Sequence, residues 1–188
     1  MHLKFKLTTW EEILKKIYSL GKKIKESGYK PDVIISILRG GAVPTAILSD
    51  ILGVQELYSI RIKLYKGVGE VGEEPQIVQG IPNNLNGKRV LIVDDVSDTG
   101  KTIIKAVEYV KELGASEIKV ATIHLKPWSS FVPHYYVEIT DHWIIYPWEY
   151  IEFIEEMETR ISKGDFSEDE ALRIKEIIEK IKEILNNF

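Results

Sequence analysis

Two nearly continuous apolar runs constrain the fold of this chain most strongly. They lie within residues Val33–Leu38 and Arg89–Asp94, and a further strand is predicted at Ile118–Leu125. A run of apolar residues without polar alternation is typical of a strand that is buried on both faces, as in parallel sheets. Helical patterns separate these runs along the chain. The alternation predicts the α/β class, with an open, mostly parallel sheet flanked by helices.

Further elements follow from capping and breaking residues. Thr9-Trp10-Glu11-Glu12 predicts a capping box that opens a helix, and Gly28 ends this helix. Other predicted elements are a short helix at about 43–52, a strand at 57–62, a helix from Gly100 to Gly114 and a strand at 135–139. A second capping box at Ser167 and Glu170 begins a C-terminal helix with an apolar stripe of Ile174, Ile178, Ile181 and Leu185. This helical tail is expected to pack on the body of the protein or across a dimer interface.

Composition excludes several classes of function. The chain has 188 residues and no cysteine, so thiolate metal sites and thiol catalysis are excluded. Its net charge of −4 argues against nucleic acid or an anionic membrane as the main partner. Its apolar runs are too short to span a bilayer, and Met1–Lys6 lacks an apolar signal core. We therefore expect a cytoplasmic protein that has no nucleic-acid or membrane partner.

A polar turn connects the strand at 89–94 to the following helix. It reads Asp94-Asp95-Val96-Ser97-Asp98-Thr99-Gly100-Lys101-Thr102. Ligands of open α/β sheets bind beyond the carboxyl ends of the strands, so this turn faces the predicted crevice. Its backbone amides, its threonine hydroxyls and the dipole of the helix suit a phosphate group. Gly100 allows the backbone to approach the ligand closely.

Three carboxylates lie in this turn, and by themselves they would repel a phosphate dianion. A divalent cation between them, or hydrogen bonds from sugar hydroxyls, would remove the conflict, and both indicate a phosphorylated sugar. A P-loop is excluded because Asp95 stands where that motif needs glycine. A receiver domain is excluded because its acidic pair follows the first strand. Helix capping by Asp98 or Thr99 would explain one polar residue of the turn but not all of them.

The turn resembles the 5-phosphoribosyl 1-pyrophosphate (PRPP) loop of type I phosphoribosyltransferases. The resemblance extends over residues 5–150 and is closest to the 6-oxopurine members, the xanthine-guanine and archaeal hypoxanthine-type enzymes. Other segments that share it are Thr9-Trp10-Glu11, Leu38-Arg39-Gly40-Gly41-Ala42-Val43-Pro44, Lys126-Pro127, Trp143-Ile144 and Pro147-Trp148-Glu149. It implies a type I phosphoribosyltransferase-like sheet with a flexible hood.

The resemblance also implies an activity. Such an enzyme transfers the 5-phosphoribosyl group from PRPP to hypoxanthine, guanine or xanthine in purine salvage, and releases pyrophosphate with Mg²⁺ as cofactor. The family domain would occupy residues 1–150, with the hood within the glycine-rich insert at 63–89, and residues 151–188 would form a C-terminal helical extension. Members of the family are commonly homodimers or larger homo-oligomers.

Individual roles are carried over from matching positions. Asp98 matches the catalytic acid placed near purine N7, where it could shuttle a proton. The residues that match the 5′-phosphate loop are Ser97, Asp98, Thr99, Gly100, Lys101 and Thr102. Asp94 and Asp95 match the acids that face the ribose hydroxyls and the metal. Arg39, Gly40 and Gly41 match the pyrophosphate loop, in which the peptide bond before the basic residue can be cis.

The remaining carried-over roles concern the purine base and a second metal ion. Lys126 matches the lysine that donates to the exocyclic O6, which favours 6-oxopurines over adenine. Trp143 matches the aromatic residue that stacks on the base, and the backbone of Ile144 would face its edge. Glu149 matches an acid that helps to bind a second metal ion. Two alternatives stay open, an adenine phosphoribosyltransferase on the same scaffold and a regulator that binds PRPP without catalysis. The preferred base, the role of the tail and any allosteric control are also open.

Overall fold

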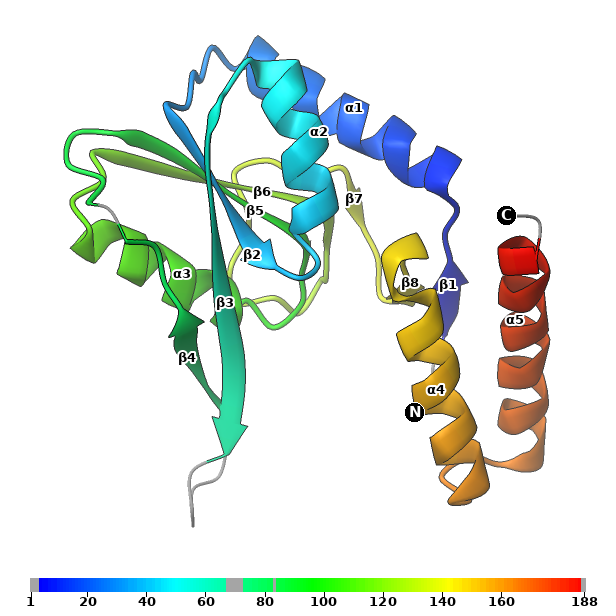
Figure 1. Cartoon of the computed structure of the whole chain (residues 1–188). Helices are drawn as coiled ribbons and strands as arrows, with labels where there is room; N and C mark the ends of the chain where they lie inside the picture. The colour runs from blue at the N-terminus through cyan, green and yellow to red at the C-terminus, as the bar shows by residue number, and fades with distance from the viewer. Residues whose placement is uncertain (1–3, 67–72, 83, 187–188) are drawn as a thin grey trace. The chain divides into compact units, whose positions relative to one another are not determined.

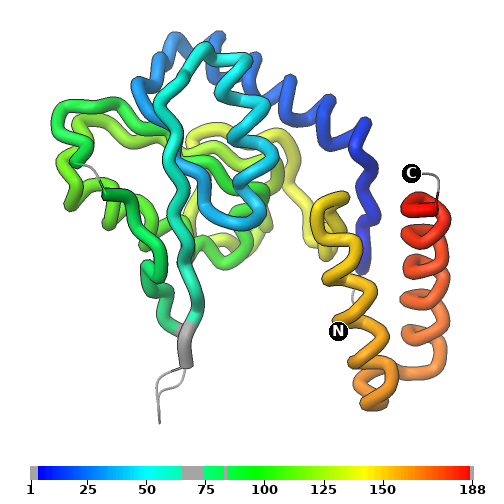
Figure 2. Tube along the Cα trace, viewed as in Figure 1, coloured from blue at the N-terminus to red at the C-terminus, as the bar shows by residue number. Residues whose placement is uncertain are grey.

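The computed structural model describes residues 4–66, 73–82 and 84–186 (Figures 1 and 2). The chain divides into two compact units. The first, here called the sheet unit, is Ile13–Asp141. The second, here called the terminal unit, combines Met1–Glu12 with His142–Phe188. The chain thus leaves the terminal unit through helix α1 (Trp10–Glu26) and returns to it after Asp141.

The sheet unit is built on a six-stranded sheet in the order β4-β3-β2-β5-β6-β7. Its strands are β2 (Val33–Leu38), β3 (Glu56–Lys66), β4 (Glu73–Gln79), β5 (Arg89–Ser97), β6 (Glu117–Leu125) and β7 (Glu138–Ile139). Adjacent strands are parallel except for the antiparallel pair β3–β4. Helix α2 (Ala42–Leu52) connects β2 to β3, and α3 (Lys101–Glu112) connects β5 to β6. The predicted α/β class and mostly parallel sheet are confirmed.

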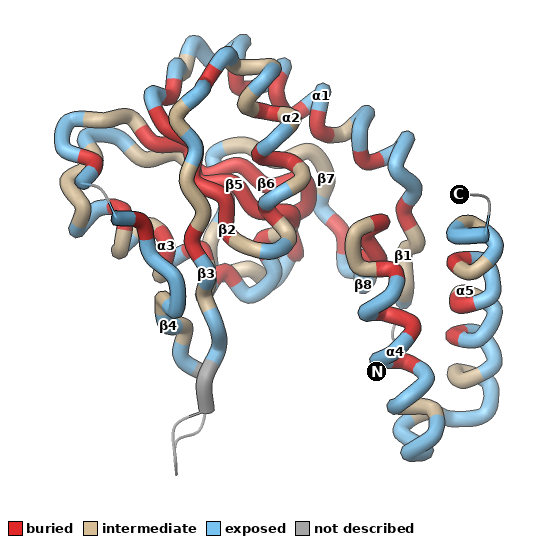
Figure 3. Tube along the Cα trace, in the orientation of Figure 1, coloured by how far each residue is buried: buried red, intermediate tan, exposed pale blue. Residues whose placement is uncertain are grey.

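Helices cover both faces of this sheet (Figure 1). On one face, Ile103, Ala106 and Val110 of α3 pack with alternate residues of the buried strands. On the other face lie α1 and α2, which pack closely on one another. A side chain at Gly21 of α1 would meet Ile51 of α2, so glycine permits this contact. The strands between these layers are buried along most of their length, as the continuous apolar runs predicted (Figure 3).

The predicted insert at 63–89 contains regular structure. Strand β3 continues to Lys66, beyond the predicted end at residue 62, and pairs with β4 along Arg61–Lys66. The glycines at 67, 69 and 72 and the residue Asn83 lie outside the described residues. Much of the predicted hood is therefore an antiparallel ribbon at the edge of the sheet. The ribbon was not predicted, because β4 carries Pro75 and several polar side chains.

The predicted strand at 135–139 was too long. Only Glu138 and Ile139 form β7, and Tyr135 makes an isolated bridge to Ala121. Backbone hydrogen bonds from Tyr135 to Val120 and from Val137 to Ile123 still hold this segment beside β6. The segment therefore runs along the edge of the sheet, and only its last two residues form a strand.

The terminal unit has its own core. Strands β1 (Phe5–Leu7) and β8 (Trp143–Ile145) pair in parallel, followed by η1 (Pro147–Glu149), α4 (Tyr150–Ser162) and α5 (Glu168–Asn186). Both Figures 1 and 2 show α4 and α5 side by side. Ile174, Ile178 and Ile181 of α5 are buried with Phe153 and Met157 of α4. Both predicted capping boxes form, since Glu12 accepts from the amide of Thr9 and Glu170 from that of Ser167.

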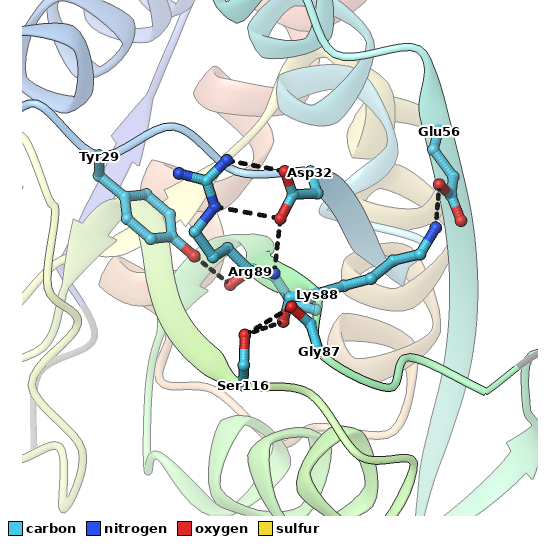
Figure 4. A network of polar contacts seen from close by, with 8 residues as sticks. Tyr29, Asp32, Glu56, Gly87, Lys88, Arg89 and Ser116 are labelled. Carbon is cyan, nitrogen blue, oxygen red and sulfur yellow. Dashed lines mark hydrogen bonds and ion pairs between the residues drawn. The ribbon is translucent and has the colours of Figure 1, made fainter.

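A polar network lies at the amino edge of the sheet (Figure 4). Arg89, the first residue of β5, donates two side-chain hydrogen bonds to Asp32, and its amide donates a third. Lys88 pairs with Glu56 of β3, and Ser116 before β6 donates to the carbonyl of Gly87. The network thus connects the starts of the four central strands. A cavity of about 560 Å³ lies at this edge, and the residues that line it are Lys25, Gly28, Tyr29, Lys30, Pro31, Asp32, Leu52, Gly53, Val54, Gln55 and Glu56.

Within the described residues, we find no helix with the length and apolar character needed to cross a membrane.

Candidate active site

The predicted phosphate turn lies between the end of β5 and the start of α3. Strand β5 continues to Ser97, so Asp98, Thr99 and Gly100 form the turn itself. Gly100 has a φ of 83° and occupies the N-cap position of α3, and the hydroxyl of Thr99 accepts a hydrogen bond from the amide of Lys101 at 3.4 Å. A non-glycine residue would be strained at this φ. Gly100, and not Asp98 or Thr99, therefore occupies the N-cap position, while the Thr99 hydroxyl bonds to the first amide of the helix.

This turn lies at the topological switch point of the sheet. From β2 the chain crosses through α2 to β3, and from β5 it crosses through α3 to β6, in opposite directions along the sheet. Strands β2 and β5 are adjacent and parallel, with Ser36 paired to Val93. Ligands of open α/β sheets bind at such a point, beyond the carboxyl ends of the two strands. Arg39, Gly40 and Gly41 follow β2 there, beside Asp95 in the last part of β5.

The two turns approach one another closely. A side chain at Gly40 would overlap the carboxyl group of Asp95, and one at Gly41 would overlap the carbonyl oxygen of Val93. Glycine at both positions is therefore required by packing against β5. The peptide bond between Leu38 and Arg39 is cis. The structure thus brings together the predicted pyrophosphate loop and the predicted PRPP loop.

A third segment, Lys126–Phe131, is hydrogen-bonded to the phosphate turn and is here called the brace. The amide of Lys126 donates to the carbonyl of Ser97 at 2.9 Å, and the amide of Ser130 donates to that of Thr99 at 3.1 Å. The Ser130 hydroxyl donates to the same Thr99 carbonyl at 2.6 Å. Any Cβ at residue 100 would lie 2.6 Å from the amide nitrogen of Phe131. Gly100 is thus needed for this contact as well as for its backbone angle.

Ser97 and Ser129 add side-chain contacts to the brace. Their hydroxyls lie 2.8 Å apart, and the Ser97 hydroxyl donates to the carbonyl of Phe131 at 2.9 Å. Ser97 is fully buried. Its side chain therefore holds the turn to the segment after β6. Sequence reasoning assigned Ser97 to phosphate binding and overlooked Ser129, although the pair Ser129-Ser130 directly follows the recognised Lys126-Pro127 segment.

Lys126 and Asp98 lie near one another in this braced region. Lys126 is only 7% exposed, and burial lowers the pKa of its ammonium group. The negative charges of Asp98 and Asp141 act in the opposite direction on that pKa. Asp98 is exposed and accepts a hydrogen bond from the indole nitrogen of Trp128 at 3.0 Å. A buried cation and an accessible carboxylate thus lie at one end of the sheet, as expected for residues that contact a polar ligand.

The acidic pair Asp94 and Asp95 is almost buried, with 9% and 7% exposure. The Asp95 amide donates to the carboxylate of Asp94 at 2.9 Å. Among residues 4–66, 73–82 and 84–186, no group of three or more acidic, histidine or cysteine side chains is arranged to hold a metal ion. Mg²⁺ is usually bound through one or two carboxylates together with substrate phosphates and water. The two aspartates at the switch point fit that mode of binding.

The residues predicted to bind the base or a second metal ion belong to different units. Lys126 is in the sheet unit, whereas Trp143, Ile144 and Glu149 are in the terminal unit. Trp143 is 47% exposed and Ile144 is buried, both in β8. Glu149 lies at the end of η1. The roles of these three residues stay predictions.

A comparison with protein-family models identifies the fold. The model of the phosphoribosyl transferase domain matches residues 6–156. This chain belongs to the phosphoribosyl transferase domain family. The match includes both loops at the switch point, the brace and strand β8.

Relatives of this phosphoribosyl transferase are found among curated proteins and solved structures. The crystal structure of a purine phosphoribosyltransferase from Pyrococcus horikoshii is 50% identical, covers 77% of this chain and 93% of its own, and has a TM-score of 0.71. A xanthine-guanine phosphoribosyltransferase of Nitratidesulfovibrio vulgaris is 32% identical over 75% of this chain and 82% of its own. One of Gluconobacter oxydans is 29% identical with the same coverage.

Proposed function

We propose that this chain transfers the 5-phosphoribosyl group from PRPP to a 6-oxopurine, which is hypoxanthine, guanine or xanthine, in purine salvage. The observation that carries the proposal is the contact of the Arg39–Gly41 turn with the Asp94–Thr102 segment at the switch point. The names of the relatives support the choice of a purine base. The products would be the nucleoside 5′-monophosphate and pyrophosphate.

The proposed reaction breaks the bond between C1 of the ribose and the pyrophosphate oxygen, and it forms a bond from C1 to a purine nitrogen. Positive charge develops on the ribose as the first bond breaks. The acids Asp94 and Asp95 would accept hydrogen bonds from the ribose hydroxyls and stabilise this charge. When bound, Mg²⁺ would supply charge stabilisation to the pyrophosphate. Asp94 and Asp95 would be its protein ligands, and Glu149 would help to bind a second metal ion.

Anion binding would be shared by the two turns. The amides at the start of α3, with Thr99, Lys101 and Thr102, would hold the 5′-phosphate. Gly40 and Gly41 would present amides to the pyrophosphate, and Arg39 would add a fixed positive charge. Because the two turns lie against one another, one PRPP molecule could contact both.

The purine base would be bound by the residues to which the resemblance gives that role. Lys126 would donate to O6, and Asp98 would exchange a proton with the imidazole ring near N7 as the new bond forms. Trp143 would stack on the base, and the backbone of Ile144 would face its edge. A cation opposite O6 favours a carbonyl group over the amino group of adenine.

A competition assay tests the proposal. The four bases hypoxanthine, guanine, xanthine and adenine compete for one limiting pool of PRPP with Mg²⁺. We expect monophosphates of one or more oxopurines and little of the adenine product. Predominant adenine product would indicate the adenine enzyme. Binding of PRPP without turnover of any base would favour the regulator. A homo-oligomer in the cytoplasm stays a prediction, which sedimentation and cell fractionation would check.

A further inference from the structure

Trp128 contacts both polar side chains of the sheet unit that the proposed function assigns to the base. Its indole nitrogen donates to the Asp98 carboxylate at 3.0 Å. The ammonium group of Lys126 lies 5.4 Å from the centre of its ring. Trp128 itself is 52% exposed, so burial of its apolar surface does not account for its position. Sequence reasoning did not identify this residue.

We propose that Trp128 is a positioning residue, which fixes the Asp98 carboxylate and the Lys126 ammonium group relative to one another for the purine. The inference rests on the proposed function, because that function gives Asp98 and Lys126 their roles at N7 and O6. It adds a residue that touches neither reacting atom.

The backbone beside Trp128 is well placed to hold the ring. The amide of Ser129 donates to the carbonyl of Lys126 at 3.0 Å, which closes the turn that carries the indole. On either side of this turn, Lys126 and Ser130 bond to the two ends of the phosphate turn, at Ser97 and Thr99. Trp128 and Asp98 therefore project from two segments that are tied together by their backbones. The side-chain bond then orients groups whose main chains are already fixed.

The chemistry of the indole suits this role. The indole N–H can only donate, so it orients a carboxylate without competing for a proton. It occupies one oxygen of Asp98 and leaves the second for the imidazole ring of the purine. The face of the indole attracts the positive charge of Lys126. One side chain thus contacts the carboxylate of Asp98 and the ammonium group of Lys126.

Two substitutions separate these contacts. Trp128→Phe keeps an aromatic face for Lys126 but removes the donor to Asp98, and Trp128→Leu removes both. The matched control is Trp10→Phe, the same change at an exposed tryptophan whose ring packs on Trp148 in the terminal unit. For each full-length variant, kcat, the KM of hypoxanthine, the Kd of PRPP with Mg²⁺, and the melting temperature are measured.

We expect Trp128→Phe to lower kcat by about tenfold, in the range of one hydrogen bond to a charged group. Its KM for hypoxanthine, its PRPP affinity and its melting temperature should stay close to those of the unchanged protein. Trp128→Leu should in addition raise the KM for hypoxanthine by about threefold, from loss of the cation–π contact. Trp10→Phe should leave all four quantities unchanged.

Three results would overturn the inference. An unchanged kcat in Trp128→Phe would show that the indole N–H does not position Asp98. Parallel losses of kcat, PRPP affinity and melting temperature would show a purely structural role. Absence of turnover in the unchanged protein would overturn the proposed function and this inference together, so the two failures are distinguishable.

Discussion

Gly40 lies directly against the carboxyl group of Asp95, and a Cβ atom at residue 40 would overlap all three atoms of that group. The contact joins the turn after β2 to the acids at the end of β5. Asp95 is almost buried, so its side chain has little room to move aside. The absence of a side chain at residue 40 therefore sets the position of the carboxylate.

Gly40→Ala should displace the Asp95 carboxylate and weaken PRPP binding. We expect the Kd for PRPP with Mg²⁺ to rise by about tenfold and the protein to lose about 1–3 kcal/mol of stability from overpacking. Calorimetric titration and denaturant unfolding measure the two effects.

Gly28→Ala is the control. A Cβ atom at residue 28 meets no atom within 4 Å, but the φ of 76° is strained for alanine. It should cost about 1–2 kcal/mol and leave PRPP binding intact. Unchanged PRPP binding in Gly40→Ala would refute the argument.

Asp98→Asn should slow catalysis more than it weakens PRPP binding. An amide keeps the oxygen that accepts from Trp128 but cannot take a proton from the base, so we expect kcat to fall by about a hundredfold. The Kd of PRPP should change by less than about threefold, because phosphate binding relies on backbone amides. Steady-state kinetics and titration with PRPP measure both. Asp50→Asn, at an exposed residue of α2, serves as control. Equal loss of kcat and PRPP affinity would assign a structural role to Asp98.

The buried strands and the phosphate turn could be predicted because their signals are local. Residues 33–38 are almost wholly apolar and residues 90–93 wholly so, and parallel strands buried on both faces need that composition. The segment from Asp94 to Thr102 is one continuous motif. The capping box at Ser167 similarly marked the start of α5 to within one residue.

Other features depend on contacts between distant residues. Strand β1 has three residues and pairs with β8, so that Phe5 lies opposite Trp143. Nothing in either short segment indicates this partner. The brace formed by Ser129 and Ser130 likewise exists only because the ends of β5 and β6 are adjacent. Such features follow from the topology and could not be read from sequence patterns.

The pH dependence of kcat/KM should reveal the buried Lys126. Burial lowers its pKa, so its ammonium group loses a proton at a lower pH than an exposed lysine does. Above that pKa the charge opposite O6 is gone, and kcat/KM for the oxopurine should fall as pH rises. In Lys126→Arg the guanidinium does not titrate in this range, so this decline should vanish.

The ratio of kcat/KM between the unchanged protein and Lys126→Arg isolates the effect. Ionisation of the base itself affects both proteins equally and cancels in the ratio. We expect kcat/KM of the unchanged protein, divided by that of Lys126→Arg, to decrease steadily as the pH rises on the alkaline side. A ratio that is independent of pH would mean that Lys126 does not bind the base as a cation.

Asp32 should contribute stability that is lost in acid. Hydrogen bonds from the Arg89 side chain and amide lower the Asp32 pKa to about 2 (Figure 4). Because the pKa of Asp32 is lower in the folded state, its contribution to stability is complete at pH values above the usual aspartate pKa. This contribution is lost as the pH falls through about 2. Both side chains are about 40% exposed, so we expect a contribution of less than about 1 kcal/mol.

Melting temperatures of Asp32→Asn and the unchanged protein between about pH 5 and about pH 2.5 measure this contribution. The two values should differ most at the higher pH and converge in acid. Asp50→Asn should show no such convergence. A difference that stays constant with pH would mean that the ion pair is not the source of the stability.

Ile178→Ala should destabilise the terminal unit. Ile178 is 3% exposed in the core that α5 shares with α4 and Ile145 of β8. Removal of such a buried side chain typically costs about 2–5 kcal/mol, through lost burial and the cavity that remains. The control is Leu172→Ala on the same helix, where the side chain is 60% exposed and the expected change is within about 0.5 kcal/mol. Denaturant unfolding of the full chain, followed by fluorescence and circular dichroism, measures both variants. Equal stability of the two variants would contradict the packing of α5 on α4. A loss of stability confined to Ile178→Ala would make the C-terminal helix an integral part of the core that includes β8.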